Sequence, residues 1–483
     1  MEDKIRLRRS SKKSRTGCRT CRMRHVKCDE TPGMCQRCTS TGRKCDGYDS
    51  QRLPSRRTTG ALTELAPGIA HRFRWKLTSD EKRCISFFQN RVGPSIVGYF
   101  DCVLWQRLVL QLSQSEPAAF HAVVAFSAVY ADYETRGLPR KPDEMDNSLQ
   151  RFALDQCARA YSRLNSRSAS QDPGLRDITL VCCVLFVMIE WMRGQYTTAS
   201  IHMKNGLRII QQDQTLTAAS AAFSSVLSQC IADSLASLNI QSTYFGIDDL
   251  TQQPQPPQTP PQSDPPTPTS PPDSPSTPLD DKTFHTLLDA RLTFEPLISE
   301  IFHFHLTTTT TTHLPTSSLP HPYGPLSDTQ FSLLSRLNRF ALALESFSIA
   351  SKPHLPRNAL RTIHTMQLHH QVLSILVTLT LVTDDEPVLE FHTPGFERAV
   401  VLAESIIASF TNRPSVCLDM GVILPLAFVV TKCPEEGVRA RALRVLQSWP
   451  HREGTWESGV MAEWASRAFV VGGDVDVFMG MFA

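Results

Sequence analysis

The sequence predicts a small metal-stabilised domain at the N-terminus, followed by a mainly all-α domain that contains a disordered proline-rich linker. Three observations support this prediction. Six of the 14 cysteines lie between residues 18 and 45. From Ser79 onward apolar residues recur with a helical period, and Ile178–Ile189 is apolar almost all round, as in a fully buried helix. Residues 254–278 contain 12 of the 33 prolines, a composition that cannot join a packed core.

The charge is unevenly distributed along the chain. Residues 1–57 carry 17 Lys and Arg against 6 Asp and Glu, whereas the remaining residues carry 33 against 41. A basic end on an acidic body indicates a polyanionic partner for that end. The first residues contain no apolar segment typical of a secretory signal, and no apolar run approaches the roughly 20 residues of a membrane span, so we expect neither export nor membrane insertion.

The six clustered cysteines follow the spacing C-x2-C-x6-C-x6-C-x2-C-x6-C, in which each of the first three recurs 17 residues later. Three disulfides are one interpretation, but we expect a reducing compartment, where cysteine clusters bind metal more often. Two zinc ions need eight coordination positions, and six thiolates supply eight if two of them bridge. The spacing therefore predicts a binuclear zinc site with six ligands: Cys18, Cys21, Cys28, Cys35, Cys38 and Cys45.

The stretch GCRTCRMRHVKCDETPGMCQRCTSTGRKCDGY, residues 17–48, resembles the Zn2Cys6 binuclear cluster of fungal transcription factors. In that family each half is a short helix followed by an extended strand, and the first helix points its end into the DNA major groove. The family's first and fourth cysteines bridge the metals. The resemblance therefore implies two Zn²⁺ ions bridged by Cys18 and Cys35.

The family reads a CGG triplet with residues between its second and third cysteines. The resemblance places base contacts on Arg24 and His25, and Arg is a donor that suits the guanine acceptors O6 and N7. Two departures stand out: many members carry Lys where His25 stands, and Pro32 lies three residues before Cys35 instead of the usual two. Phosphate contacts, which position a protein without reading sequence, are expected for five more residues: Arg19, Arg22, Lys27, Arg43 and Lys44.

A basic arm precedes the cluster. We interpret it as a nuclear localisation signal or as extra phosphate contact, with a merely solubilising tail as the alternative. Its basic residues are Lys4, Arg6, Arg8, Arg9, Lys12, Lys13 and Arg15.

The segment after the cluster contains Pro54 and Pro67 and has no heptad repeat, so it does not predict a dimerising coiled coil. We therefore expect residues 1–78 to bind DNA as a monomer and any homodimer to form through the helical body.

Helical patterning dominates the rest of the chain, and a helix start is expected at Ser79–Lys82 because acidic residues fill the first turn. Further helices are predicted at 117–134, 178–189, 195–211, 283–305, 327–350, 356–382, 396–411 and 436–449, with no strand pattern between the later ones. Five Ser/Thr-Pro pairs in the proline-rich stretch fit either phosphorylation sites or linker composition alone.

Blocks at residues 80–130, 178–210 and 418–458 resemble the all-helical regulatory domain that is specific to fungal regulators. We therefore predict the following organisation: basic arm 1–16, Zn2Cys6 domain 17–48, linker 49–78, first regulatory part 79–250, disordered proline-rich linker 251–281, and second regulatory part 282–483 with a low-complexity stretch at 307–325.

The residues contain no motif of a known enzyme class: neither G-x-S-x-G, G-x-G-x-x-G, a P-loop nor H-E-x-x-H. Cys182 and Cys183 are expected to pack in the core, and the histidines lack metal-ligand spacing, so we expect them to be packed or on the surface: His303, His305, His364, His369 and His370.

The sequence predicts a nuclear transcription factor of RNA polymerase II genes that binds double-stranded DNA and the transcription machinery, without a membrane partner and without enzymatic activity. The alternative is a zinc-dependent interaction or metal-sensing protein that does not read DNA. The basic residues Arg22, Arg24 and Lys27 favour the first, because a purely structural zinc module does not need them.

Overall fold

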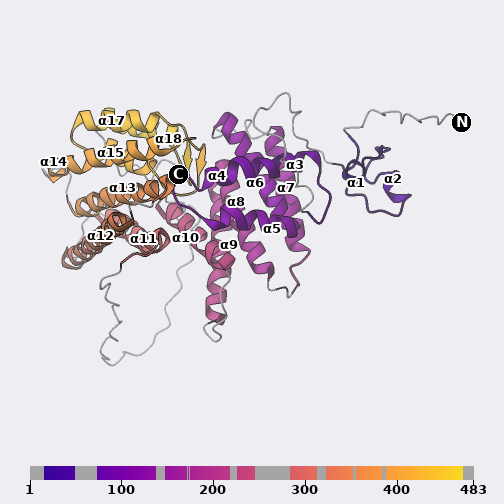
Figure 1. Ribbon diagram of the computed structural model, residues 1–483, viewed down its shortest axis with the longest axis horizontal. Helices are drawn as coiled ribbons and strands as arrows, with labels where there is room; N and C mark the ends of the chain where they lie inside the picture. The colour runs from indigo at the N-terminus through magenta and orange to yellow at the C-terminus, as the bar shows by residue number, and fades with distance from the viewer. Residues whose placement is uncertain are drawn as a thin grey trace. The chain divides into compact units, whose positions relative to one another are not determined.

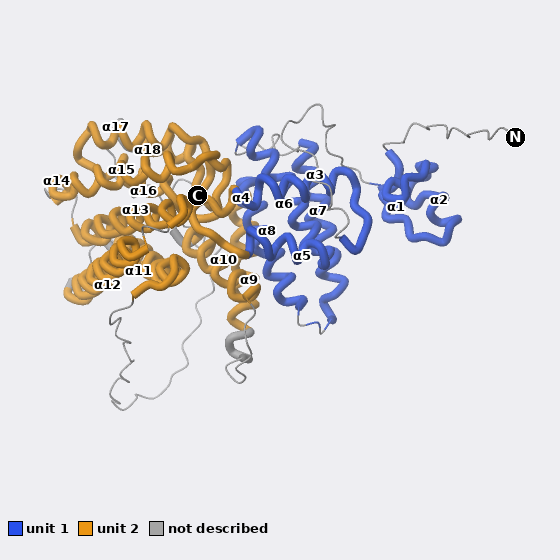
Figure 2. The backbone as a smooth tube through the Cα atoms, in the orientation of Figure 1, with its two compact units in different colours: residues 1–94, 104–194 blue, residues 95–103, 195–483 orange. Residues whose placement is uncertain are grey.

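A computed structural model describes ten parts of the chain: residues 16–48, 73–137, 147–170, 172, 174–217, 226–244, 283–312, 323–351, 355–382 and 388–471. The chain divides into two compact units (Figure 2), residues 1–94 with 104–194 and residues 95–103 with 195–483. The predicted order, a six-cysteine cluster followed by a mainly helical domain, is confirmed. No helix among the described residues has both the length and the apolar character needed to cross a membrane.

The helical part of the first unit is built around one buried helix, α6 (Pro117–Arg136). Every residue of α6 from Ala118 to Tyr133 is buried. Four helices pack against it (Figure 1): α3 (Ser79–Phe87), α5 (Val109–Ser115), α7 (Ser148–Asn165) and α8 (Gly174–Met192). In α8 the continuous apolar run is buried on nearly all sides, and Cys182 and Cys183 lie in this core as predicted.

Helix α3 begins at Ser79, as the sequence predicts, because Thr78 and Glu81 form a reciprocal cap. The Thr78 hydroxyl accepts a bond from the Glu81 N–H at 3.3 Å, and the Thr78 N–H donates to the Glu81 carboxylate at 2.8 Å. Short helical pieces then lead to α5: a π-helical turn at Phe88–Val92, α4 (Gly93–Ile96) and a second π-helical turn at Leu104–Leu108.

The second unit is also mainly helical. In Figure 1, α15 lies between α13 and α17, and the residue contacts confirm both pairings. Helix α13 also packs on α11 and α12, and α16 packs on α17 and α18. The helices of this unit are α9 (Tyr196–Thr217), α10 (Val226–Tyr244), α11 (Leu287–Thr312), α12 (Tyr323–Ser351), α13 (Arg357–Leu379), α14 (Val388–Phe391), α15 (Thr393–Ser409), α16 (Ile423–Lys432), α17 (Glu436–Gln447) and α18 (Ser458–Val471).

A small sheet corrects the expectation that no strand occurs in this part. Strand β1 (Val416–Cys417) pairs in parallel with β2 (Arg452–Glu453), and β2 pairs antiparallel with β3 (Trp456–Glu457). Each strand has two residues, which is too short to show the alternation of apolar and polar side chains that reveals a strand in a sequence.

Glu453 of β2 joins distant segments of the second unit. Its carboxylate accepts the N–H groups of Gly421, Val422 and Ile423 at 2.8–3.0 Å, where α16 begins. It also contacts the Tyr99 hydroxyl and the His451 ring. Burial acts to raise the pKa of Glu453, but these donors together hold it below its usual value. The carboxylate is therefore ionised and fully engaged in the core.

Helix α11 continues beyond its predicted end at residue 305 into the threonine run. Thr307, Thr308 and Thr309 donate their hydroxyls to carbonyls four residues earlier, at 2.7–2.9 Å, which satisfies these groups inside the helix. Several predicted segments lie outside the described residues: the arm at 1–15, residues 49–72 of the linker, the proline-rich stretch 251–281 and the tail after residue 471.

Candidate metal centre

The six cysteines are held by two short helices that begin in the same way. Helix α1 (Arg19–Met23) follows Cys18, and α2 (Gln36–Thr39) follows Cys35. The sulfur of each preceding cysteine accepts the N–H three residues later, at 3.3 Å from Cys21 and 3.2 Å from Cys38. A sulfur thus occupies the position that a Ser, Thr or Asp oxygen usually takes at a helix start.

The sulfur atoms form two overlapping groups of four. One group is Cys18, Cys21, Cys28 and Cys35, and the other is Cys18, Cys35, Cys38 and Cys45. Within each group all sulfur atoms lie within 4.8 Å of one another. The shortest separations are 3.6–3.7 Å, for example 3.6 Å between Cys18 and Cys35. Tetrahedral zinc with bonds of ~2.3 Å places its sulfur ligands about 3.8 Å apart, so the residues fit two zinc ions that share Cys18 and Cys35.

The chemistry of the buried thiols also requires a cation. Burial raises the pKa of the bridging candidates Cys18 and Cys35 well above the usual thiol value. Cys28 differs: burial acts to raise its pKa, but N–H groups of Cys18 and Glu30 and the Tyr48 hydroxyl lower it to about 7. Only a bound metal allows all six to be thiolates at neutral pH, because a coordinated thiol is deprotonated outright.

Two left-handed residues end each half of the cluster. His25 (φ 57°) and Glu30 (φ 61°) hold these positions in the first half, and Gly42 (φ 64°) and Gly47 (φ 72°) hold them 17 residues later. The turn after each helix also repeats: Val26 N–H bonds the Cys21 carbonyl at 3.1 Å, and its counterpart makes the same bond at 3.0 Å. The repeat of the cysteine spacing is thus a repeat of backbone structure.

Two aspartates connect the halves, and the sequence analysis missed them. Asp29 accepts the N–H of Arg37 in α2 at 2.8 Å, and Asp46 accepts the hydroxyl of Thr20 in α1 at 2.9 Å. Each aspartate therefore supports the first turn of the helix in the other half. The available signal was the Cys-Asp dipeptide, which occurs at residues 28–29 and again at residues 45–46.

The predicted DNA contacts do not share one environment. Arg22 and Arg24 are half-buried, whereas four are exposed: His25, Lys27, Arg43 and Lys44. Arg19 is buried and forms an ion pair with Glu81 at the start of α3, so a phosphate contact by Arg19 requires this pair to open. The basic arm, Arg6, Arg8, Arg9, Lys12, Lys13 and Arg15, lies outside the described residues.

The chain is similar to known proteins in both parts. Residues 16–55 match the model of the fungal Zn(2)-Cys(6) binuclear cluster domain, and residues 83–387 match that of the fungal specific transcription factor domain. The latter covers more than half of the chain.

Curated relatives agree with this assignment. An aspercryptin biosynthesis cluster-specific transcription regulator of Emericella nidulans is 30% identical over 232 residues, 42% of this chain and 35% of that protein. The transcription regulator lscL of Purpureocillium lilacinum is 32% identical over 206 residues, 40% of this chain and 48% of that protein. The transcriptional regulatory protein moc3 of Schizosaccharomyces pombe is 51% identical over 39 residues, 8% of each chain.

The alignments thus span about a third to a half of the first two relatives. Together with the two shared-ligand sulfur groups, the match over residues 83–387 shows that this chain belongs to the fungal-specific transcription factor family and carries its Zn2Cys6 binuclear cluster.

Proposed function

We propose that this chain is a nuclear regulator that recognises CGG-type triplets in the promoters of RNA polymerase II genes. The supporting observation is the asymmetry of its cluster. After α1 the chain presents Arg24 and His25, whereas the corresponding residues after α2 are Thr41 and Gly42. Arg and His offer hydrogen-bond donors to guanine, and Gly offers no side chain. The first half is therefore the half that reads bases.

Phosphate contacts supply the rest of the affinity. Lys27 and Lys44 are exposed and occupy corresponding positions in the two halves. Exposed lysines add electrostatic affinity without sequence preference. The assignment thus separates readout by Arg24 and His25 from anchoring by Lys27, Arg43 and Lys44.

The test is binding of the full chain to a duplex with one CGG triplet and to duplexes with each base replaced. We expect Arg24→Ala to lower affinity for CGG by about 1–3 kcal/mol and to flatten the base preference. Arg37→Ala is the matched control, because Arg37 is exposed on α2 and its loss removes the same charge. An unchanged base preference in Arg24→Ala would refute the assignment, and absence of any CGG preference in the wild type would favour the non-DNA alternative.

We also propose that the helical body forms a homodimer, which would bring two clusters together on DNA. An apolar stripe on α12 supports this: Phe331, Leu342 and Ile349 are 73%, 64% and 68% exposed. Their spacings of 11 and 7 residues place them on one face of the helix. Exposed apolar rows of this kind are typical of protein-protein contacts.

Sedimentation of the full chain tests this part. Leu342→Lys is expected to shift a dimer to monomer, whereas Ser332→Lys adds the same charge on another exposed face of α12 and leaves the dimer intact. A wild-type chain that remains monomeric at micromolar concentration would contradict the proposal. Recruitment of the transcription machinery is assigned to the same body.

A further inference from the structure

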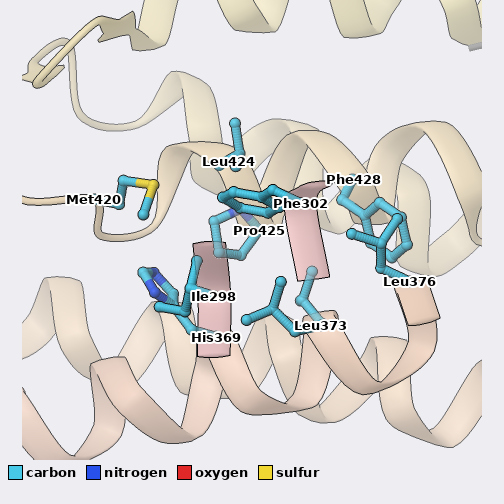
Figure 3. A pocket seen from close by; sticks show the side chains of 10 residues that line it. Ile298, Phe302, His369, Leu373, Leu376, Met420, Leu424, Pro425 and Phe428 are labelled. Atoms are coloured by element: carbon cyan, nitrogen blue, oxygen red, sulfur yellow. The ribbon is translucent and has the colours of Figure 1, made fainter. Parts of the chain in front are cut away.

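The second unit contains two hydrophobic cores that meet at an imperfectly packed seam. Met420, Leu424 and Phe428 are partly buried and pack against both cores. Beside them lies a cavity of about 30 Å³, which is room for roughly two water molecules (Figure 3). Its walls come from three elements: Ile298 and Phe302 of α11, His369, Leu373 and Leu376 of α13, and the segment from Met420 to Phe428.

The wall is apolar except for His369, and the hydrogen bonding of this residue fixes its chemistry. His369 Nε2 lies 2.7 Å from the Gly421 carbonyl oxygen, which can only accept, so Nε2 carries the hydrogen. Burial lowers the pKa of His369, which keeps the ring neutral. Nδ1 is therefore a lone-pair acceptor, and His369 makes no second hydrogen bond among the described residues.

A second cavity of about 30 Å³ adjoins the first and shares Ile298, His369 and Met420 with it. Its polar wall is already satisfied: Arg291 bonds Glu295 at 2.7 Å and Asp419 at 2.8 Å. Met420 lines both spaces, and its flexible, unbranched side chain adapts readily to a ligand. The free hydrogen-bonding group at the seam is thus the acceptor of His369.

We propose that this seam binds a small, mainly apolar molecule with one hydrogen-bond donor, of the size and chemistry of a phenol. The ring would pack among Phe302, Leu373 and Phe428, and its hydroxyl would donate to His369 Nδ1. A single aromatic ring needs more room than 30 Å³, so its entry displaces Met420. The ligand would connect α11, α13 and α16 and thereby stabilise the second unit. This inference is independent of the DNA readout proposed above.

The experiment is thermal unfolding of the full chain with phenol or with toluene, which has nearly the same shape but no donor. Phenol is expected to raise the unfolding temperature saturably. The ratio of the toluene Kd to the phenol Kd should fall about tenfold in His369→Leu, the loss expected for one buried hydrogen bond. Taking the ratio cancels the different hydrophobicities of the two probes and any general destabilisation by the substitution.

Two variants complete the test. His364→Leu removes a half-buried histidine of the same helix that lines neither cavity, and it should leave the ratio unchanged. Met420→Ala opens room at the seam, so both probes should bind more tightly. The proposal is overturned if phenol gives no saturable shift in either the wild type or Met420→Ala, or if His369→Leu leaves the ratio as it is in the wild type.

Discussion

The two halves of the zinc cluster share a backbone but not a surface. Each half begins with a cysteine sulfur that caps a short helix, and each helix is followed by left-handed residues at the same two positions. The second half uses glycine at both, Gly42 and Gly47, whereas the first uses His25 and Glu30. A non-glycine residue in this conformation costs about 1 kcal/mol.

This difference shows which half is adapted to binding metal alone. The second half has the residues that its backbone favours. The first half tolerates backbone strain and in return exposes the imidazole of His25 next to Arg24. Strain of this kind is typical of functional positions, so it supports the first half as the reading half.

The largest effect is expected from breaking the part that both halves share. Cys18→Ala or Cys35→Ala removes a ligand from both sulfur groups, so we expect loss of both zinc ions and unfolding of the cluster. Cys28→Ala or Cys45→Ala removes a ligand from one group and should retain one zinc. Native mass spectrometry of the full chain measures the zinc content, and Cys102→Ala is the control outside the cluster. Equal zinc loss in Cys18→Ala and Cys28→Ala would argue against shared ligands.

The next effect concerns the aspartates that connect the halves. Asp29→Ala removes the acceptor for the N–H of Arg37, and Asp46→Ala removes the acceptor for Thr20. We expect each to weaken zinc binding by about tenfold, as for other groups that support metal ligands. Competition with a chromogenic chelator measures this. Asp46→Asn, which keeps an acceptor oxygen, should retain most of the affinity, and a normal affinity for Asp29→Ala would show that this contact is dispensable.

Exchanging the left-handed residues sharpens the comparison directly. Gly42→His should lower stability by about 1 kcal/mol, because the position has room for a Cβ but disfavours any side chain. His25→Gly should raise stability by a similar amount and flatten the preference for CGG. Thermal unfolding at fixed zinc concentration gives the first readout and DNA titration the second. If Gly42→His were neutral, the strain assigned to His25 would be too large.

The smallest effect is expected from the corresponding lysines. Lys27→Gln and Lys44→Gln should each reduce the slope of log affinity against log salt concentration by about 0.9, the value for one lost phosphate contact. The preferred sequence should not change for either, since both residues contact the backbone alone. Fluorescence anisotropy over a salt series checks this, and a change of motif in Lys27→Gln alone would assign base readout to Lys27.

The metal site could be predicted from the sequence because its information is local. The spacing of six cysteines gives the ligands and the count of two metals, and the cap at Thr78 and Glu81 lies within four residues. The Arg19–Glu81 pair and the Asp46–Thr20 bond could not be predicted, because they join residues that only the folded backbone brings together. The strands failed for a related reason, since two residues carry no periodicity.

The contacts of Glu453 have a consequence for how the protein is made. This carboxylate satisfies the Tyr99 hydroxyl, 354 residues earlier in the chain, and three N–H groups at the start of α16. Until the ribosome has released β2, those buried donors have no acceptor, so the second unit cannot complete its core during most of its own synthesis. A chain truncated before Arg452 would leave the same donors unsatisfied permanently and would be a substrate for quality control. The N-terminal cluster needs only its own short segment and zinc, so it can fold long before the body that it serves.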